Sequence, residues 1–174
     1  MSTSREAEAW AGADLEIRKA VRAETPLLQE LYVEAARWRV SRGILLWDEK
    51  MFTPEYFAEL MADCELFIAY SGGVAVGCFT LQWSDKLLWG ERDRGDAGYL
   101  HRLVVTRKRS GLRLGTRLLE RAEDYIRQTG KTYFRLDCMS ENARLNAYYR
   151  NAGFVYLETV TGDGWSANLY EKKL

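Results

Sequence analysis

The sequence predicts a mixed α/β chain whose elements follow the order βααβββαβαββ. Short runs rich in β-branched and aromatic residues are typical of strands. Between several of these runs, apolar residues recur at helical spacing. The chain's only two prolines each follow a threonine, a pattern typical of the start of a helix. The chain has 174 residues, 47% of them hydrophobic, which fits one domain with a sizeable core.

The first half of the chain is expected to contain two helices between strands. In Thr25-Pro26 and Thr53-Pro54 the threonine suits an N-cap, and the proline suits the first helical position, where its missing N–H has no cost. Ser71-Gly72-Gly73 is a hairpin signal. The predicted elements are strands over residues 15–21, 65–70 and 74–83 and helices over residues 26–39 and 54–61.

The second half begins with a polar connection over residues 84–96 and then alternates strands with helices. Gly130 is a reasonable helix stop, and Ser140 is predicted to cap a short helix. The predicted elements are strands over residues 99–105, 132–138, 154–160 and 168–172 and helices over residues 115–129 and 140–152.

Composition limits the possible functions. Twenty-five basic and twenty-five acidic residues cancel, which disfavours binding to nucleic acid or to a membrane surface. Three widely spaced cysteines and one histidine indicate neither a disulfide framework nor a metal site. Residues 1–13 lack a secretory signal and are predicted to be a flexible tail before a domain over residues 14–174. We therefore expect a cytoplasmic protein.

A basic, glycine-containing loop follows the strand over residues 99–105. The first turn of a helix has unpaired N–H groups and partial positive charge, so it attracts anions. Arg107, Lys108 and Arg109 add full charges, and Gly111 and Gly115 let an oxygen approach the backbone. The spacing matches neither a nucleotide-triphosphate loop nor the GxGxxG fingerprint. The pattern predicts a different phosphate or pyrophosphate ligand.

Two motifs resemble those of the GNAT superfamily of N-acetyltransferases. The loop resembles the family's (Arg/Gln)-x-x-Gly-x-(Gly/Ala) motif, with Ser110 in the Arg/Gln place, Arg113 at the middle glycine and Gly115 at the last one. Residues 142–154, NARLNAYYRNAGF, resemble the second hallmark, an Asn seven residues before a Tyr and then Gly-Phe. The resemblance covers roughly residues 15–174. It implies a single mixed, mostly antiparallel sheet of six to seven strands with helices on both faces.

The resemblance also implies acetyl-CoA as the cofactor. The pantetheine arm would pair with a strand backbone, and the pyrophosphate would bind the loop. Arg113 either needs positive φ, which would strain it, or has ordinary helical dihedrals and reaches a phosphate; we expect the second. The predicted cofactor-binding residues are Leu103, Val104, Val105, Arg109, Ser110, Gly111, Leu112, Arg113, Leu114, Gly115, Thr116, Asn142 and Tyr149.

The catalytic residues are predicted with alternatives open. By resemblance Tyr149 is the general acid, since a phenol is a proton donor at neutral pH. The family's usual Glu is replaced by Tyr99, so His101 or Asp137 is the candidate base. Tyr99 and Asp137 are also candidates to contact the substrate, together with Trp47 and Trp165, whose nearby acids suit a cationic amine. The tryptophans are alternatively explained as packing residues.

The resulting hypothesis is an acetyl-CoA-dependent N-acetyltransferase that acts on a small amine by direct transfer. An O-acyltransferase or a user of longer acyl-CoA fits the same motifs. A non-catalytic acyl-CoA-binding module is the alternative from another class, because the usual Glu is missing and the loop is altered. A homodimer is expected from the exposed C-terminal strands.

Overall fold

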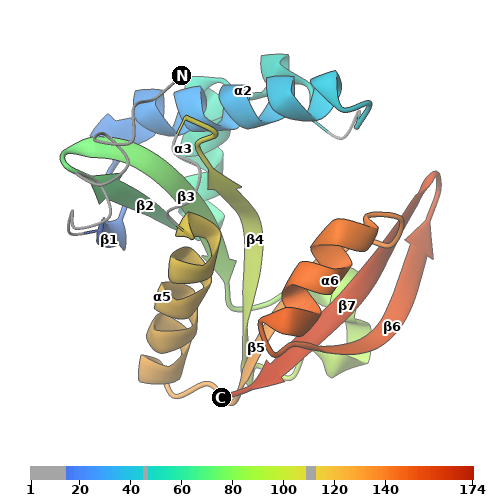
Figure 1. Ribbon diagram of the computed structural model, residues 1–174. Helices are drawn as coiled ribbons and strands as arrows, with labels where there is room; N and C mark the ends of the chain where they lie inside the picture. The colour runs from blue at the N-terminus through green and yellow to red at the C-terminus, as the bar shows by residue number, and fades with distance from the viewer. Residues whose placement is uncertain (1–14, 45–46, 109–112) are drawn as a thin grey trace. The chain divides into compact units, whose positions relative to one another are not determined.

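The structure is a computed structural model that describes residues 15–44, 47–108 and 113–174 (Figure 1). Its main elements follow the predicted order, and residues 1–13, the predicted tail, lie outside the described residues. The strands are β1 (Leu15–Lys19), β2 (Glu65–Ser71), β3 (Val74–Gln82), β4 (Ala97–Val105), β5 (Tyr133–Met139), β6 (Val155–Gly162) and β7 (Trp165–Lys173). The helices are α2 (Thr25–Ser41), α3 (Pro54–Asp63), α4 (Lys86–Trp89), α5 (Leu114–Gln128) and α6 (Ala143–Asn151), with 3-10 turns η1 (Arg22–Glu24), η2 (Glu49–Met51) and η3 (Gly90–Arg92).

The strands form one seven-stranded sheet in the hydrogen-bonded order β1-β2-β3-β4-β5-β7-β6. β1 and β2, β5 and β7, and β6 and β7 pair antiparallel, while β4 and β5 pair parallel. The prediction of a mixed, mostly antiparallel sheet of six to seven strands is therefore confirmed. In the described ranges, no helix combines the length and apolar character needed to cross a membrane.

The described chain divides into two compact units. The first comprises the residues up to Thr80 together with Arg102–Leu119, and the second comprises Leu81–His101 and Glu120–Leu174. That residues 14–174 form one domain stays a prediction.

An aromatic cluster forms the core of the first unit. The Tyr32 ring of α2 stacks on Trp47 at 5.5 Å and meets Phe52 and Phe57 edge-on at 5.1 and 5.2 Å. Such arrangements are favourable for aromatic quadrupoles. Alternate β2 residues, of which Ile68 is fully buried, pack against the same cluster. The cluster attaches α2, α3 and the connection between them to β2.

The two Thr-Pro pairs begin helices differently. Thr53 caps α3 as predicted, because its side chain accepts a hydrogen bond from the Tyr56 N–H. The predicted cap at Thr25 is wrong by one residue. The turn η1 leads directly into α2, so Thr25 already has helical dihedrals and Glu24 precedes the helix.

Glu24 fixes η1 to β1. Arg18 donates hydrogen bonds of 3.0 and 2.7 Å to its carboxylate, the Val21 N–H donates at 2.8 Å, and the Tyr70 hydroxyl also donates. Although burial opposes ionisation, the Arg18 guanidinium and the other donors lower the pKa of Glu24 to about 2. Its contribution to stability is therefore complete above its ordinary pKa of 4.5 and is lost as the pH falls towards 2.

Glu24→Gln is expected to lower the free energy of unfolding by about 2 kcal/mol at neutral pH, because it removes a charge-assisted pair. The difference from the unmodified protein should shrink below about pH 4, where the unfolded carboxylate takes up a proton. Urea denaturation at both pH values measures this. Glu16→Gln is the matched control, since Glu16 also pairs with Arg18 but its side chain is 65% exposed. Equal losses in the two variants would contradict the assignment.

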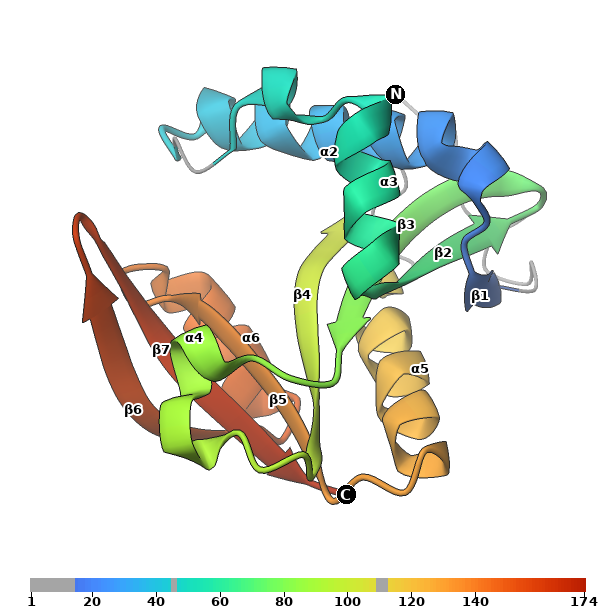
Figure 2. The same ribbon diagram turned by 180° about the vertical axis from the view of Figure 1, so that it is seen from behind.

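In the second unit, helices cover both faces of the strands. α6 lies on one face of β5 and β7, and the segment carrying α4 lies on the other, as the two opposite views show (Figures 1 and 2). On the α4 side, Trp89 packs with Tyr99 and Leu169. Residues 84–96, predicted as a polar connection, therefore contain a short helix and a buried tryptophan.

Candidate active site

β4 stops pairing with β5 partway along its length. The parallel register joins Ala97–Leu100 to Tyr133–Leu136 and ends there, although β4 continues to Val105. Arg102, two residues beyond the last pair, has a φ of 53°, a left-handed conformation that residues with a Cβ rarely adopt. Backbone strain of this kind is concentrated at functional sites. The pairing between β4 and β5 therefore does not engage the backbone N–H and C=O groups of Leu103–Val105.

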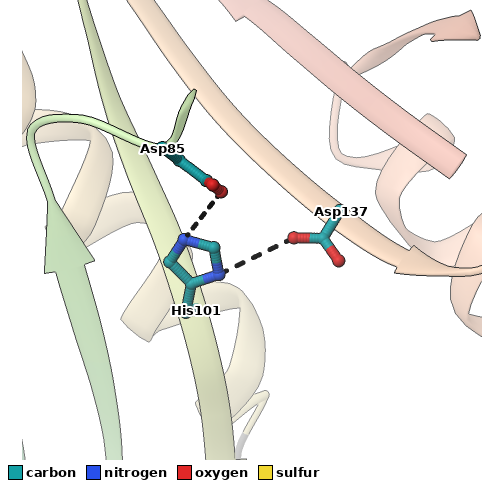
Figure 3. A group of neighbouring side chains, drawn as sticks. All are labelled: Asp85, His101 and Asp137. Atoms are coloured by element: carbon teal, nitrogen blue, oxygen red, sulfur yellow. Dashed lines mark ion pairs between the residues drawn. The ribbon is translucent and has the colours of Figure 1, made fainter. Parts of the chain in front are cut away.

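His101 of β4 lies between two carboxylates (Figure 3). Its Nε2 is 3.4 Å from Asp85 Oδ2, and its Nδ1 is 3.6 Å from Asp137 Oδ1. The exposed fraction of the side chain is 9% for Asp85, 17% for His101 and 23% for Asp137. The Asp137 side of the imidazole is therefore its more open side. The structure brings together the two candidate bases predicted from the sequence, and it adds Asp85.

Asp85 is positioned by hydrogen bonds within the segment that joins β3 to β4. Its Oδ1 accepts from the Leu88 N–H at 3.3 Å and caps α4. Asp93 accepts from the Asp85 N–H at 3.0 Å and from the Ser84 hydroxyl at 2.6 Å. Burial opposes ionisation of Asp93, but hydrogen bonds from Ser84 and Tyr99 hold its pKa below the ordinary value. An aspartate shortly before an apolar run, here Leu87-Leu88-Trp89, is an N-cap pattern, and this signal could have identified Asp85.

Tyr99 lies behind the site. Its side chain is completely buried, and its hydroxyl donates to Asp93 at 3.0 Å and accepts from Arg135 at 2.9 Å. Burial raises the pKa of Tyr99 to about 12, although Arg135 opposes this, so the phenol stays neutral. Arg135 is held in turn by Glu171 at 2.8 Å. The side chain of Tyr99 is thus buried, and its contact with substrate stays a prediction.

His101 and the two carboxylates beside it are residue types that bind metal ions. One ligand atom from each of Asp85, His101 and Asp137 lies within 4.8 Å of the others. However, the carboxylates face different ring nitrogens, and one ion binds an imidazole through only one nitrogen. The arrangement therefore fits hydrogen bonding to the imidazole better than coordination of a shared ion.

Helix α6 carries the second predicted motif. Asn142, and not the predicted Ser140, is its N-cap: the Asn142 side chain accepts from the Leu145 N–H at 3.0 Å. Ser140 instead shares a 2.6 Å hydrogen bond with Ser166 of β7. Seven residues after Asn142, Tyr149 is 5% exposed, with its ring against Phe154 and Tyr170. The cap is thus one established role of Asn142, while its contact with cofactor stays a prediction.

Asn146 joins α6 to β5 and β7 and was missed from the sequence. Its amide nitrogen donates to Met139 O at 3.0 Å and to Asn142 O at 2.8 Å, and its oxygen accepts from Asn168 and Tyr170 at 2.7 and 2.6 Å. Buried polar groups with all hydrogen bonds made specify one arrangement. Asn146 therefore determines how the Tyr149 helix sits on these strands.

The predicted phosphate loop is described in part. Arg109, Ser110, Gly111 and Leu112 lie outside the described residues. Leu114, Gly115 and Thr116 form the first turn of α5, which begins one residue before the predicted start at Gly115. Arg113 has a φ of 49°, which corrects the expectation of ordinary helical dihedrals. The family's glycine at this position would adopt this conformation without the Cβ penalty that Arg113 incurs.

Helix α2 fixes the residues before the loop. The Glu34 carboxylate accepts from the Thr106 hydroxyl at 2.9 Å and from the Arg107 N–H at 2.7 Å. The Arg107 guanidinium lies 3.7 Å from the Trp38 ring centroid. These contacts direct the chain as it leaves β4 and place basic side chains near the start of the loop.

Trp47 belongs to a cavity in the first unit. Besides stacking on Tyr32, its indole is covered by the Arg39 guanidinium at 3.7 Å. The cavity has a volume of about 400 Å³ and is lined by Ala36, Arg37, Val40, Trp47, Asp48 and Glu49. Trp47 therefore both packs in the aromatic cluster and lines the cavity.

Trp165 begins β7 in the second unit. It is 48% exposed, and its indole covers Gly162 so closely that a Cβ there would lie 2.2 Å from the ring. One ring face packs on the β6–β7 turn and the remainder is open to solvent. Contact with substrate stays a prediction for Trp165, as it does for Trp47.

The chain is similar to known acetyltransferases. Residues 27–154 match the "Acetyltransferase (GNAT) family". An uncharacterised N-acetyltransferase of Bacillus subtilis, YesJ, is 38% identical over 93 residues, which is 53% of this chain and 49% of that protein. The chain thus spans about half the length of the curated relative it matches.

Solved structures share the fold. A GNAT-family acetyltransferase from Listeria monocytogenes has a TM-score of 0.77 at 23% identity, over 94% of this chain and 96% of that one. The PaiA N-acetyltransferase from Thermoplasma acidophilum, solved with coenzyme A, has a TM-score of 0.70 at 20% identity, over 92% and 99%. The putative acetyltransferase YncA from Salmonella typhimurium, solved with acetyl-CoA, has a TM-score of 0.63 at 19% identity, over 92% and 94%. With its two motifs, its strand order and its family match in agreement, the chain belongs to the GNAT family of acetyltransferases.

Proposed function

We propose that this protein transfers the acetyl group of acetyl-CoA directly to the amine of a small molecule. The observation that carries the proposal is the position of His101 between Asp85 and Asp137, directly beyond the last β4–β5 pair. A base at that place is what an amine acceptor requires, because an ammonium ion has no lone pair with which to attack a carbonyl.

The residues present fit acetyl-CoA. The backbone of Leu103–Val105, which the β5 register does not use, offers the donors and acceptors that an extended ligand pairs with. The first turn of α5 at Leu114–Thr116 offers N–H groups and the positive end of a helix dipole to a diphosphate. Acetyl-CoA supplies the acetyl group as a thioester. Residues 109–112 and Asn142 complete the proposed cofactor contacts.

His101 and Asp137 would prepare the amine. In this proposal the Asp137 carboxylate holds the incoming ammonium group, and His101 Nδ1 takes its proton. Nδ1 is the ring nitrogen on the more open side, 3.6 Å from Asp137. In proteins without bound substrate, catalytic contacts are often long and shorten in the complex.

Tyr149 would supply the second proton. Its phenol donates a proton to the sulfur as the carbon–sulfur bond breaks, so coenzyme A departs as a thiol in a poorly solvated site. The second proton that the acetylated nitrogen loses would restore the phenol, and the proton taken by His101 would pass to solvent. Tyr149 is 5% exposed and lies one helical turn beyond Asn146, whose buried hydrogen bonds restrain α6. A restrained proton donor needs little reorganisation during the reaction.

A small cationic amine fits the charges near the predicted acceptor loops. The cavity beside Trp47 combines an aromatic face with Asp48 and Glu49, and aromatic faces attract cations. Its volume of about 400 Å³ suits a small molecule. Taken by itself, the cavity therefore suits a small cationic molecule.

The cellular setting is also proposed. The free cysteines Cys64, Cys78 and Cys138 are buried, consistent with a reducing, cytoplasmic compartment. β6 is an edge strand with Val155 and Tyr156 63% and 42% exposed. A second copy would cover this edge in a homodimer.

Acetyl-CoA at 100 times its Kd is expected to stabilise the protein by about 2.7 kcal/mol, whereas acetate and ATP should not.

Thiol release across amines, amino acids and antibiotics, each matched with its alcohol analogue, then identifies the acceptor. Preference for the alcohols or for longer acyl-CoA would favour the alternative transferases. Stabilisation without thiol release for any acceptor would favour a binding module, and the absence of both would refute the proposal.

A further inference from the structure

Asp85 and Asp137 compete for the proton of one imidazole. A neutral imidazole carries a single N–H, so its proton lies on Nε2, towards Asp85, or on Nδ1, towards Asp137. Only the first tautomer leaves a lone pair on the open side of the ring. The tautomer therefore decides whether His101 is able to accept a proton there.

Distance and burial favour Asp85. Its Oδ2 is 3.4 Å from Nε2, compared with 3.6 Å for Asp137 and Nδ1, and its side chain is 9% exposed compared with 23%. A less exposed carboxylate interacts more strongly with an N–H, because less water screens it. Among the described residues, Asp85 Oδ2 is buried and has no hydrogen-bond partner, so a proton on His101 Nε2 would satisfy it. A small rotation of either side chain would shorten the 3.4 Å contact.

Hydrogen bonds within its own segment hold Asp85 in place. Its second oxygen is engaged by the Leu88 N–H, and its backbone is held by Asp93. Asp93 in turn accepts from the buried Tyr99, which Arg135 fixes. A chain of hydrogen bonds therefore runs from the interior of the unit to the backbone N–H of Asp85, whose carboxylate faces His101.

We infer that Asp85 is a positioning residue that keeps the His101 proton on Nε2 and so leaves the Nδ1 lone pair for the acceptor amine. The role of this lone pair in catalysis rests on the proposed function, whereas the tautomer of His101 can be measured without any substrate. A buried aspartate that fixes the tautomer of a catalytic histidine has a precedent in hydrolases, where its replacement by asparagine lowers kcat by about 10⁴-fold.

His101 is the chain's single histidine, so its ring nitrogens are the only ones of their kind in a protein labelled with ¹⁵N-histidine. A long-range ¹H–¹⁵N correlation spectrum at about pH 8 should show a protonated Nε2 and an unprotonated Nδ1. A proton on Nδ1, or on both nitrogens, would overturn the inference. This measurement needs neither substrate nor variant.

Asp85→Asn is the decisive variant, because asparagine caps helices as well as aspartate does and α4 should remain. An amide is able to donate to Nε2, so the Nδ1–H tautomer should gain population. We expect kcat to fall by about 100-fold or more, with the KM for acetyl-CoA within about threefold of the original. Asp124→Asn is the matched control, since Asp124 is 61% exposed on α5.

These experiments distinguish a failure of the proposed function from a failure of the role assigned to Asp85. If no amine is acetylated but the spectrum shows Nε2–H, the proposed function fails and the tautomer assignment stands. If turnover is normal but the spectrum of Asp85→Asn equals that of the unmodified protein, the positioning role fails and the proposed function stands.

Discussion

Replacing Tyr149 by phenylalanine is expected to lower kcat by about 100-fold or more, with the Kd for acetyl-CoA within about threefold of the original. The change removes one hydroxyl and keeps the ring, which packs against Phe154 and Tyr170. If the hydroxyl protonates the departing sulfur, its loss raises the barrier to the chemical step and leaves cofactor binding almost unchanged. Thiol release and calorimetry measure the two quantities separately.

Tyr148→Phe is the matched control. Tyr148 lies beside Tyr149, with ring centroids 5.4 Å apart, and its hydroxyl is buried without a hydrogen-bond partner in the described parts of the chain. Removing that hydroxyl should leave kcat unchanged and should not lower the free energy of unfolding. Equal kcat for the two variants, or a loss of affinity as large as the loss of turnover in Tyr149→Phe, would contradict the acid role of Tyr149.

His101→Gln is expected to lower kcat/KM by about 10² to 10⁴-fold at neutral pH, the range typical of a missing general base. The deficit should shrink as the pH rises, because a growing share of the amine then arrives without its extra proton. Below the pKa of the amine, the variant's rate should increase by about tenfold per pH unit, the slope set by the fraction of neutral amine. Initial rates over this pH range measure the effect.

The same pH series with Asp124→Asn provides the control, which should follow the unmodified protein throughout. A His101→Gln deficit that is independent of pH would mean that His101 supports the fold or binds the acceptor without acting as a base. A deficit below about threefold would remove His101 from the mechanism.

Short sequence patterns predicted helix starts and turns well where these depend only on adjacent residues. Thr53-Pro54 begins α3 and Ser71-Gly72-Gly73 joins two strands, because caps and turns depend on a few adjacent residues. Thr25 was misplaced as a cap because the turn η1 adds helical residues before it, and the turn depends on the contact between Glu24 and Arg18.

The candidate site was predicted in part. His101 was chosen because it lies two residues after Tyr99, which stands where the family usually has a Glu, and Asp137 because it ends the adjacent strand on its polar face. The parallel pairing of β4 with β5 brings these strands together. Asp85 was missed because it reaches His101 through a connection whose path depends on buried contacts of Trp89 and Tyr99. Nothing in the local sequence indicates the positive φ of Arg102 or of Arg113, since arginine has no preference for that conformation.

The most direct test of acetyl transfer by this protein is calorimetric titration with acetyl-CoA, followed by thiol release with the best acceptor amine. We expect saturable heat at millimolar acetyl-CoA or below, and one equivalent of coenzyme A released for each acetylated amine. The absence of both heat and thermal stabilisation at millimolar acetyl-CoA would contradict the assignment of Leu103–Val105 and the first turn of α5 as the cofactor site, and with it the proposed enzyme.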